Sequence, residues 1–134
     1  KTGAINVQEL LSHYELFDRK YQAFTLSETE QQVMSQWPDH LSIEIYFGTW
    51  CHDSQREVPR LLKALAKHDN IPLQLTLLDH QKSDPQGQAK IKKVKYTPTF
   101  IIYQDQREIG RIIERPKVSL IADITQFINE PTKQ

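Results

Sequence analysis

The sequence predicts an α/β domain, a three-layer α/β/α sandwich in which helices cover both faces of a mixed central sheet. Residues 43–48, 73–78 and 99–103 are rich in β-branched, aromatic and leucine side chains, which is typical of buried strands. The first two are separated by one helix and short connections, and such units form right-handed parallel crossovers. A turn at 104–106 predicts an antiparallel return over 107–114. Parallel and antiparallel pairs together make the sheet mixed.

The N-terminal segment predicts an extra helix ahead of the sheet. Asn6 is a preferred helix-capping residue, and Glu9 stands three positions later, at the spacing of a capping box. Apolar residues then recur at helical spacing as far as Phe17. We therefore expect residues 1–20 to form an N-terminal helical extension and residues 21–130 to form the main domain.

The next elements follow from local signals. Residues 21–24 predict a short strand. Ser27 and Glu30 have capping-box spacing and open a helix, which stops before Pro38 because the residue preceding a proline disfavours the helical conformation. A long helix is expected from about residue 51 to residue 68, where apolar positions again recur at helical spacing.

Two further helices complete the pattern. Residues 86–93 predict a short helix after the turn Ser83-Asp84-Pro85. Pro116 is expected to begin the last helix, because proline is favoured at the first helical position. The apolar side of that helix consists of Val118, Leu120, Ile121, Ile124, Phe127 and Ile128.

Composition restricts the partners of the chain. Its 134 residues include 17 basic and 17 acidic side chains, so general electrostatics favours no nucleic-acid partner. No apolar run approaches the roughly 18 residues that a membrane-spanning helix requires. We expect a monomer.

Because the sequence begins at Lys1 without a methionine, we expect a periplasmic or exported protein after leader removal, with a cloning boundary as the alternative.

The only cysteine, Cys51, lies where the first strong strand becomes the long helix, within Trp50-Cys51-His52-Asp53-Ser54. We expect it in the first helical turn, where free backbone N–H groups and the helix dipole favour a thiolate. Such sites lower a cysteine pKa from about 8.5 to roughly 3.5–7.5. The position therefore predicts a nucleophile, and the alternative is a small buried apolar residue.

Two more features accompany this cysteine. Pro59 lies inside the long helix, eight residues after Cys51, and Tyr96-Thr97-Pro98 stands directly before the strand at 99–103. With Trp50-Cys51-x-x-Ser54, these features resemble the thioredoxin superfamily over roughly residues 21–129. The resemblance implies a kinked helix that carries the active cysteine, and a cis proline at Pro98 facing it.

The resemblance also implies roles for individual residues. Cys51 and Ser54 would be catalytic, with Ser54 donating a hydrogen bond to the Cys51 sulfur. The substrate-binding residues would be Trp50 and Tyr96 at an apolar rim, Thr97 and Pro98 along the substrate backbone, and His52, which could stabilise the thiolate when protonated.

Two departures from the family pattern concern the same chemistry. Serine stands at Ser54, where dithiol thioredoxins have the second cysteine that resolves a mixed disulfide. Ile45 stands where those proteins commonly have a buried acidic residue that assists proton transfer. The neighbouring Glu44 is expected to point to the other face of the strand. The motif is therefore similar to a monothiol variant of the family.

The sequence thus favours a monothiol thiol–disulfide redox protein that forms mixed disulfides with protein or small-thiol substrates. Two alternatives stay open: a non-catalytic binding or chaperone module with the same fold, and an iron–sulfur carrier similar to monothiol glutaredoxins. This sequence lacks the Cys-Gly-Phe-Ser motif of monothiol glutaredoxins, which argues against an iron–sulfur carrier. We expect no cofactor and no metal, because the adjacent residues Cys51 and His52 cannot complete a tetrahedral site.

Overall fold

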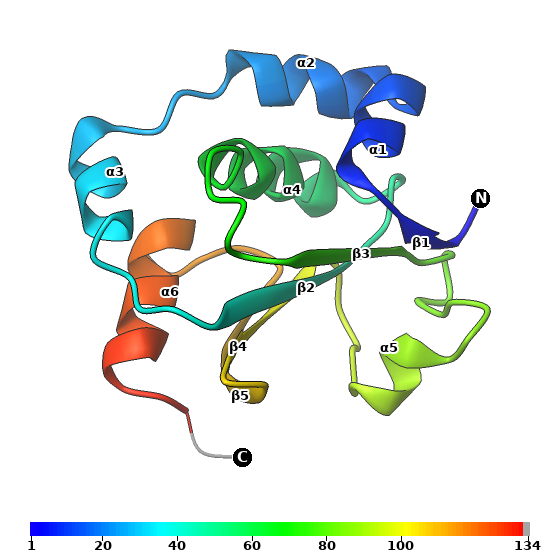
Figure 1. Ribbon diagram of the computed structural model, residues 1–134. Coiled ribbons are helices and arrows are strands. Elements are labelled where there is room, and N and C mark those ends of the chain that lie inside the picture. Colours follow the sequence, from blue (N-terminus) through cyan, green and yellow to red (C-terminus); the bar gives the residue numbers. More distant parts are fainter. Residues whose placement is uncertain (133–134) are drawn as a thin grey trace.

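The computed structural model describes residues 1–132 and confirms the α/β class, with a mixed, open, five-stranded sheet (Figure 1). The strand order is β1-β3-β2-β4-β5. Strand β2 runs parallel to β3, whereas β1 pairs with β3, β4 with β2 and β5 with β4 in antiparallel fashion. The strands are β1 (Gly3–Ile5), β2 (Leu41–Phe47), β3 (Leu73–Leu77), β4 (Thr99–Gln104) and β5 (Arg107–Ile113).

The described residues form six helices next to this sheet, and two of their N-caps agree with the sequence signals. Asn6 caps the first helix through a complete capping box with Glu9, and Ser27 accepts a hydrogen bond from the backbone N–H of Glu30. The helices are α1 (Val7–His13), α2 (Glu15–Ala23), α3 (Glu28–Met34), α4 (His52–Ala64), α5 (Gln88–Ile91) and α6 (Leu120–Asn129). None of them is long and apolar enough to cross a bilayer within the described part of the chain.

Three sequence expectations about elements were wrong, and one strand was not expected. The short strand expected at residues 21–24 is instead the end of α2 and the residue that follows it. The N-terminal helix breaks at Tyr14, whose extended backbone separates α1 from α2. Strand β1 was not expected at all. The last helix begins at Leu120 after the cap Ser119, because the Ser119 hydroxyl accepts the backbone N–H of Ala122.

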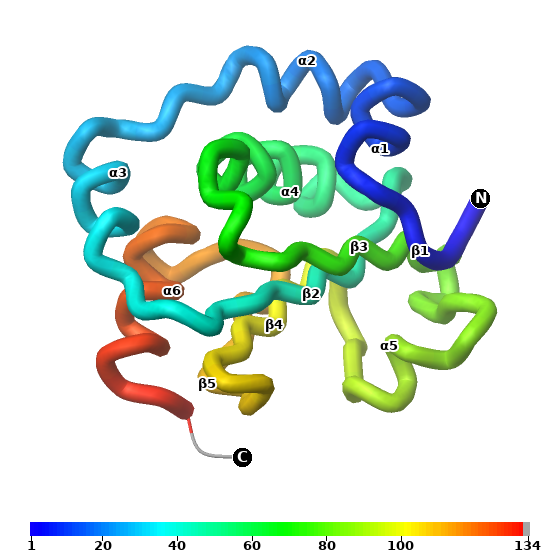
Figure 2. Tube along the Cα trace, in the orientation of Figure 1, coloured from blue at the N-terminus to red at the C-terminus, as the bar shows by residue number. Residues whose placement is uncertain are grey.

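The two faces of the sheet are covered unequally. Helices α1, α2, α3, α4 and α6 share one large apolar core with the sheet, in which Ile45, Phe47 and Phe100 are fully buried. In the described chain, α5 alone packs on the other face, opposite α4 (Figure 2). The larger core holds α4 firmly on β2 and β3, and Pro59 lies within α4, buried, with the helix continuing past it.

The thinly covered face carries a polar group around Glu44, which points away from Ile45 as expected. The hydroxyls of Tyr46 and Tyr103 donate to Glu44 Oε1 over 2.9 and 3.2 Å, and Lys92 Nζ donates to the Tyr103 hydroxyl over 2.8 Å. Burial raises the pKa of both tyrosines above the ordinary tyrosine value. This group satisfies polar atoms that would otherwise be costly on a partly covered sheet face.

Candidate active site

The candidate site lies where β2 ends and α4 begins. Cys51 is the N-cap residue of α4, one position before the first helical turn in which the sequence placed it. Its backbone N–H donates to the carbonyl of Gly48 over 3.2 Å, and its own carbonyl accepts the N–H of Gln55 over 2.9 Å. The side chain caps no backbone N–H of α4, and the half-buried Cys51 lies at the electropositive end of the helix.

The fold brings Cys51 together with the loop before β4. The Cys51 thiol donates to the Thr97 carbonyl, with Sγ and oxygen 3.3 Å apart, although 46 residues separate them in sequence. The Thr97–Pro98 peptide bond is cis, and both residues are buried. A hydrogen bond from Thr99 Oγ1 to the Tyr96 carbonyl, at 2.6 Å, closes this loop. Cys51 and the buried Thr97–Pro98 loop are therefore neighbours in the fold.

Ser54 is placed differently from expectation. It is fully buried, and its Oγ accepts the backbone N–H of Gly48 over 3.2 Å. The Ser54 hydroxyl does not donate to the Cys51 sulfur. The Cys51 thiol instead donates to the Thr97 carbonyl. Ser54 therefore fixes the turn that carries Cys51, and it acts on the sulfur only through the position of that turn.

Trp50 is held rigidly beside the cysteine. Its indole N–H donates to the Leu78 carbonyl over 3.1 Å, and its ring lies so close to Gly48 that a Cβ there would come within 2.4 Å. His80 stacks on the ring at 4.7 Å between centroids and 22° between planes. Lys82 Nζ lies 5.7 Å from the indole centroid, within cation–π range. The indole is thus a fixed wall of the site.

The charges on α4 next to the site are paired. Arg56 donates to Asp53 Oδ1 and, over 2.7 Å, to Glu57 Oε2. These hydrogen bonds, with Glu57 as the larger cause, raise the pKa of the Arg56 guanidinium. Because Asp53 is only two residues from Cys51, its pairing with Arg56 reduces the repulsion that a nearby carboxylate would exert on a thiolate.

The structure thus brings together five of the residues that the sequence selected, Trp50, Cys51, Ser54, Thr97 and Pro98. His52 and Tyr96 lie on the exposed surface beside them, with Tyr96 53% exposed. Sequence reasoning missed Arg56, although its spacing of three from Asp53 on a helix was an available signal. It also missed His80, because nothing local relates it to Trp50.

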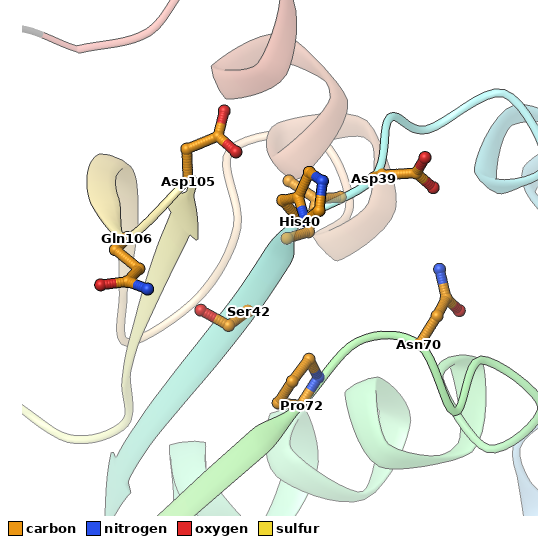
Figure 3. A pocket seen from close by; sticks show the side chains of 8 residues that line it. Asp39, His40, Ser42, Asn70, Pro72, Asp105 and Gln106 are labelled. Atoms are coloured by element: carbon orange, nitrogen blue, oxygen red, sulfur yellow. The ribbon is translucent and has the colours of Figure 1, made fainter.

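Other pockets on the surface lie away from Cys51. The pocket in Figure 3, about 640 Å³, is formed by the start of β2, the α4–β3 connection and the β4–β5 turn, at the other end of the sheet. Its labelled polar side chains, among them Asp39 and Asp105, come from these three segments. No three His, Cys, Asp or Glu side chains within residues 1–132 gather closely enough to hold a metal ion.

A half-buried cysteine at the start of a helix, opposite a proline loop on an adjoining strand, defines a thioredoxin-like site on this mixed sheet. A family model described as thioredoxin matches residues 5–124. The chain therefore belongs to the thioredoxin family. No curated protein matches the sequence.

Solved structures share the fold at low sequence identity. A protein of unknown function from Pseudomonas aeruginosa is 15% identical, with a TM-score of 0.74 over 94% of this chain and 92% of that one. Thioredoxin f2 of Chlamydomonas reinhardtii is 20% identical, with a TM-score of 0.53 over 79% of this chain and 94% of its own. Trxlp of Edwardsiella tarda is 16% identical, with a TM-score of 0.52 over 77% and 94%.

Proposed function

We propose that this protein is a monothiol thiol–disulfide exchange protein with Cys51 as its nucleophile. The observation that carries the proposal is the position of Cys51, half-buried at the N-terminus of α4 and next to the cis Thr97–Pro98 loop. A protein or small-molecule disulfide that reaches the sulfur would lie along the Thr97–Pro98 backbone, between the indole of Trp50 and the exposed ring of Tyr96.

The reaction exchanges sulfur partners in two steps. The Cys51 thiolate attacks one sulfur of the substrate disulfide, a new disulfide to Cys51 forms, and the other substrate sulfur leaves as a thiolate that takes up a proton. Since the chain has no second cysteine, an external thiolate must then attack the mixed disulfide and release Cys51. After both steps, one substrate sulfur is a free thiol and the other forms a disulfide with the external thiol; a second external thiol must attack that disulfide to reduce the substrate fully.

A binding role without turnover is the second candidate. The observation that favours it is the hydrogen bond from the Cys51 thiol to Thr97, because a donated S–H stabilises the protonated, unreactive form. In that case the Thr97–Pro98 surface recognises an extended chain through its backbone, and Cys51 is part of the wall.

Trapping distinguishes the two candidates. The reduced protein is incubated with oxidised glutathione at neutral pH, and intact mass is followed with time, with Cys51→Ser as the control. We expect one glutathione adduct that persists until dithiothreitol or free glutathione is added. An adduct that forms no faster than on a free cysteine peptide under the same conditions would exclude the exchange function and leave the binding role.

A further inference from the structure

A groove runs along the outer edge of β5 and faces α6. It encloses about 970 Å³. Four consecutive residues of β5, Gly110 to Ile113, line it. Because side chains of a strand alternate between the two faces of a sheet, four neighbours can line one groove only if it follows the open edge of the strand. The strand order agrees, since β5 is the last strand of the sheet.

The floor of the groove is apolar and depends on Gly110. The ring of Phe127 from α6 lies on this glycine, where an added Cβ would come within 2.4 Å of the ring. Ile113 and Val118 on the same groove are 46% and 81% exposed. Exposed apolar side chains that line a groove are typical of a binding surface.

The rim of the groove is basic. Four basic and two acidic side chains line it, and both acids are already engaged. Glu108 takes two hydrogen bonds from Arg111, at 2.7 and 2.8 Å, and the Asp123 carboxylate accepts the backbone N–H groups of residues 117 and 118. The other three basic side chains have no ion pair within the described residues, namely Lys93, Arg115 and Lys117.

One residue that follows α6 already bonds to the backbone of β5. The backbone N–H of Thr132 donates to the Ile109 carbonyl over 2.8 Å. At the other end of the groove, the N–H of Glu114 donates to the Pro98 carbonyl over 2.7 Å, so this end lies beside the proline loop of the candidate active site. Between these two ends, no backbone group outside the sheet bonds to residues 110–112 in the described chain.

We propose that this groove binds an extended acidic segment of a partner protein by strand addition to β5. The backbone of the segment pairs with the open edge, alternate apolar side chains face Phe127 where it covers Gly110, and its carboxylates face Arg115 and Lys117. Edge pairing and an apolar floor give affinity, and the unpaired basic rim selects acidic sequences. The site requires no reaction at Cys51 and goes beyond the exchange function.

Fluorescence anisotropy tests the proposal with a short labelled peptide in which glutamate alternates with valine. Two peptide controls replace every glutamate by lysine, or N-methylate the backbone at alternate residues. The protein variant combines Arg115→Glu with Lys117→Glu, both exposed side chains. Its matched control combines Lys20→Glu with Lys67→Glu, exposed lysines outside the groove. Circular dichroism checks that every variant is folded.

We expect the acidic peptide to bind the wild type and the control variant equally, and the groove variant on the order of tenfold more weakly, since two rim charges change sign. The lysine and N-methylated peptides should bind more weakly than the parent. Cys51→Ser should bind like the wild type, which separates this site from the exchange function. Equal binding of the N-methylated peptide would overturn strand addition. Equal binding by the groove variant would place the site elsewhere.

Discussion

Replacing Ser54 with alanine tests whether this residue acts on the turn or on the sulfur. The Ser54 hydroxyl is the partner of the buried Gly48 N–H, at 3.2 Å. Removing it leaves that donor unsatisfied, which costs about 1–3 kcal/mol of unfolding free energy. Removing one oxygen atom leaves only a very small cavity, so the lost hydrogen bond accounts for most of the expected loss of unfolding free energy.

The expected loss can be measured by urea denaturation. For a chain of this size the dependence of unfolding free energy on urea is about 1–3 kcal/mol per molar, so a loss of about 2 kcal/mol lowers the midpoint by roughly 1 M. Ser35→Ala is the matched control, because the Ser35 hydroxyl bonds to the Gln32 carbonyl on the exposed surface. Its midpoint should move by less than about a quarter of that amount.

The same Ser54→Ala protein is then alkylated with iodoacetamide as a function of pH. Because the structure shows the Ser54 hydroxyl bonded to Gly48, we expect the reactivity of Cys51 to change by less than about threefold under conditions where the variant is folded. A large fall in reactivity without loss of stability would refute this reasoning. It would restore the direct hydrogen bond from serine to sulfur that the sequence predicted.

Three further predictions concern other parts of the molecule. Ser54→Cys should form an internal disulfide with Cys51 after mild oxidation, detected as loss of free thiols, because the two positions are one helical turn apart; two persistent free thiols would contradict this. Asn6→Ala should lower the unfolding free energy by about 1 kcal/mol, measured by urea denaturation, through loss of a helix cap; an unchanged midpoint would show that α1 frays in solution. Tyr46 and Tyr103 should stay protonated beyond the ordinary tyrosine pKa of about 10, so ultraviolet titration should show their ionisation only at higher pH. Since the folded state disfavours the charged form, stability should fall as the pH rises past 10, and full ionisation there without unfolding would count against their burial.

Strands β2 to β5 and the main helices of the fold were predictable because each has a strong local signal. The segment at 21–24 was not, because packing outweighs its aromatic content. Lys63 of α4 donates to the Tyr21 carbonyl over 3.0 Å, and its ammonium lies 5.0 Å from the Tyr21 ring, which holds the end of α2 against α4. Strand β1 has only three residues, and its partners on β3 are 70 to 74 positions away.

The candidate site was also predictable only in part. The strand-to-helix junction predicted where Cys51 would lie, and the thioredoxin resemblance pointed to the Thr97–Pro98 loop. The partner of Ser54 was not predictable, because the Gly48 N–H meets the serine only when the chain reverses direction between β2 and α4. The stacking of His80 on Trp50 likewise depends on where the loop after β3 returns to the sheet.

The antiparallel pairing of β1 has a consequence for the solution behaviour of the protein. An uncovered strand edge can recruit other chains, and short edge strands are one way in which proteins limit such pairing. β1 covers β3 from Leu75 to Leu77, and three residues offer little length for a further strand to join. A chain that lacked residues 1–5 would present β3, an inner strand with Leu75 and Leu77 buried, as a bare edge. The first five residues thus cover the edge of β3 that would otherwise be open to pairing, independently of any chemistry at Cys51.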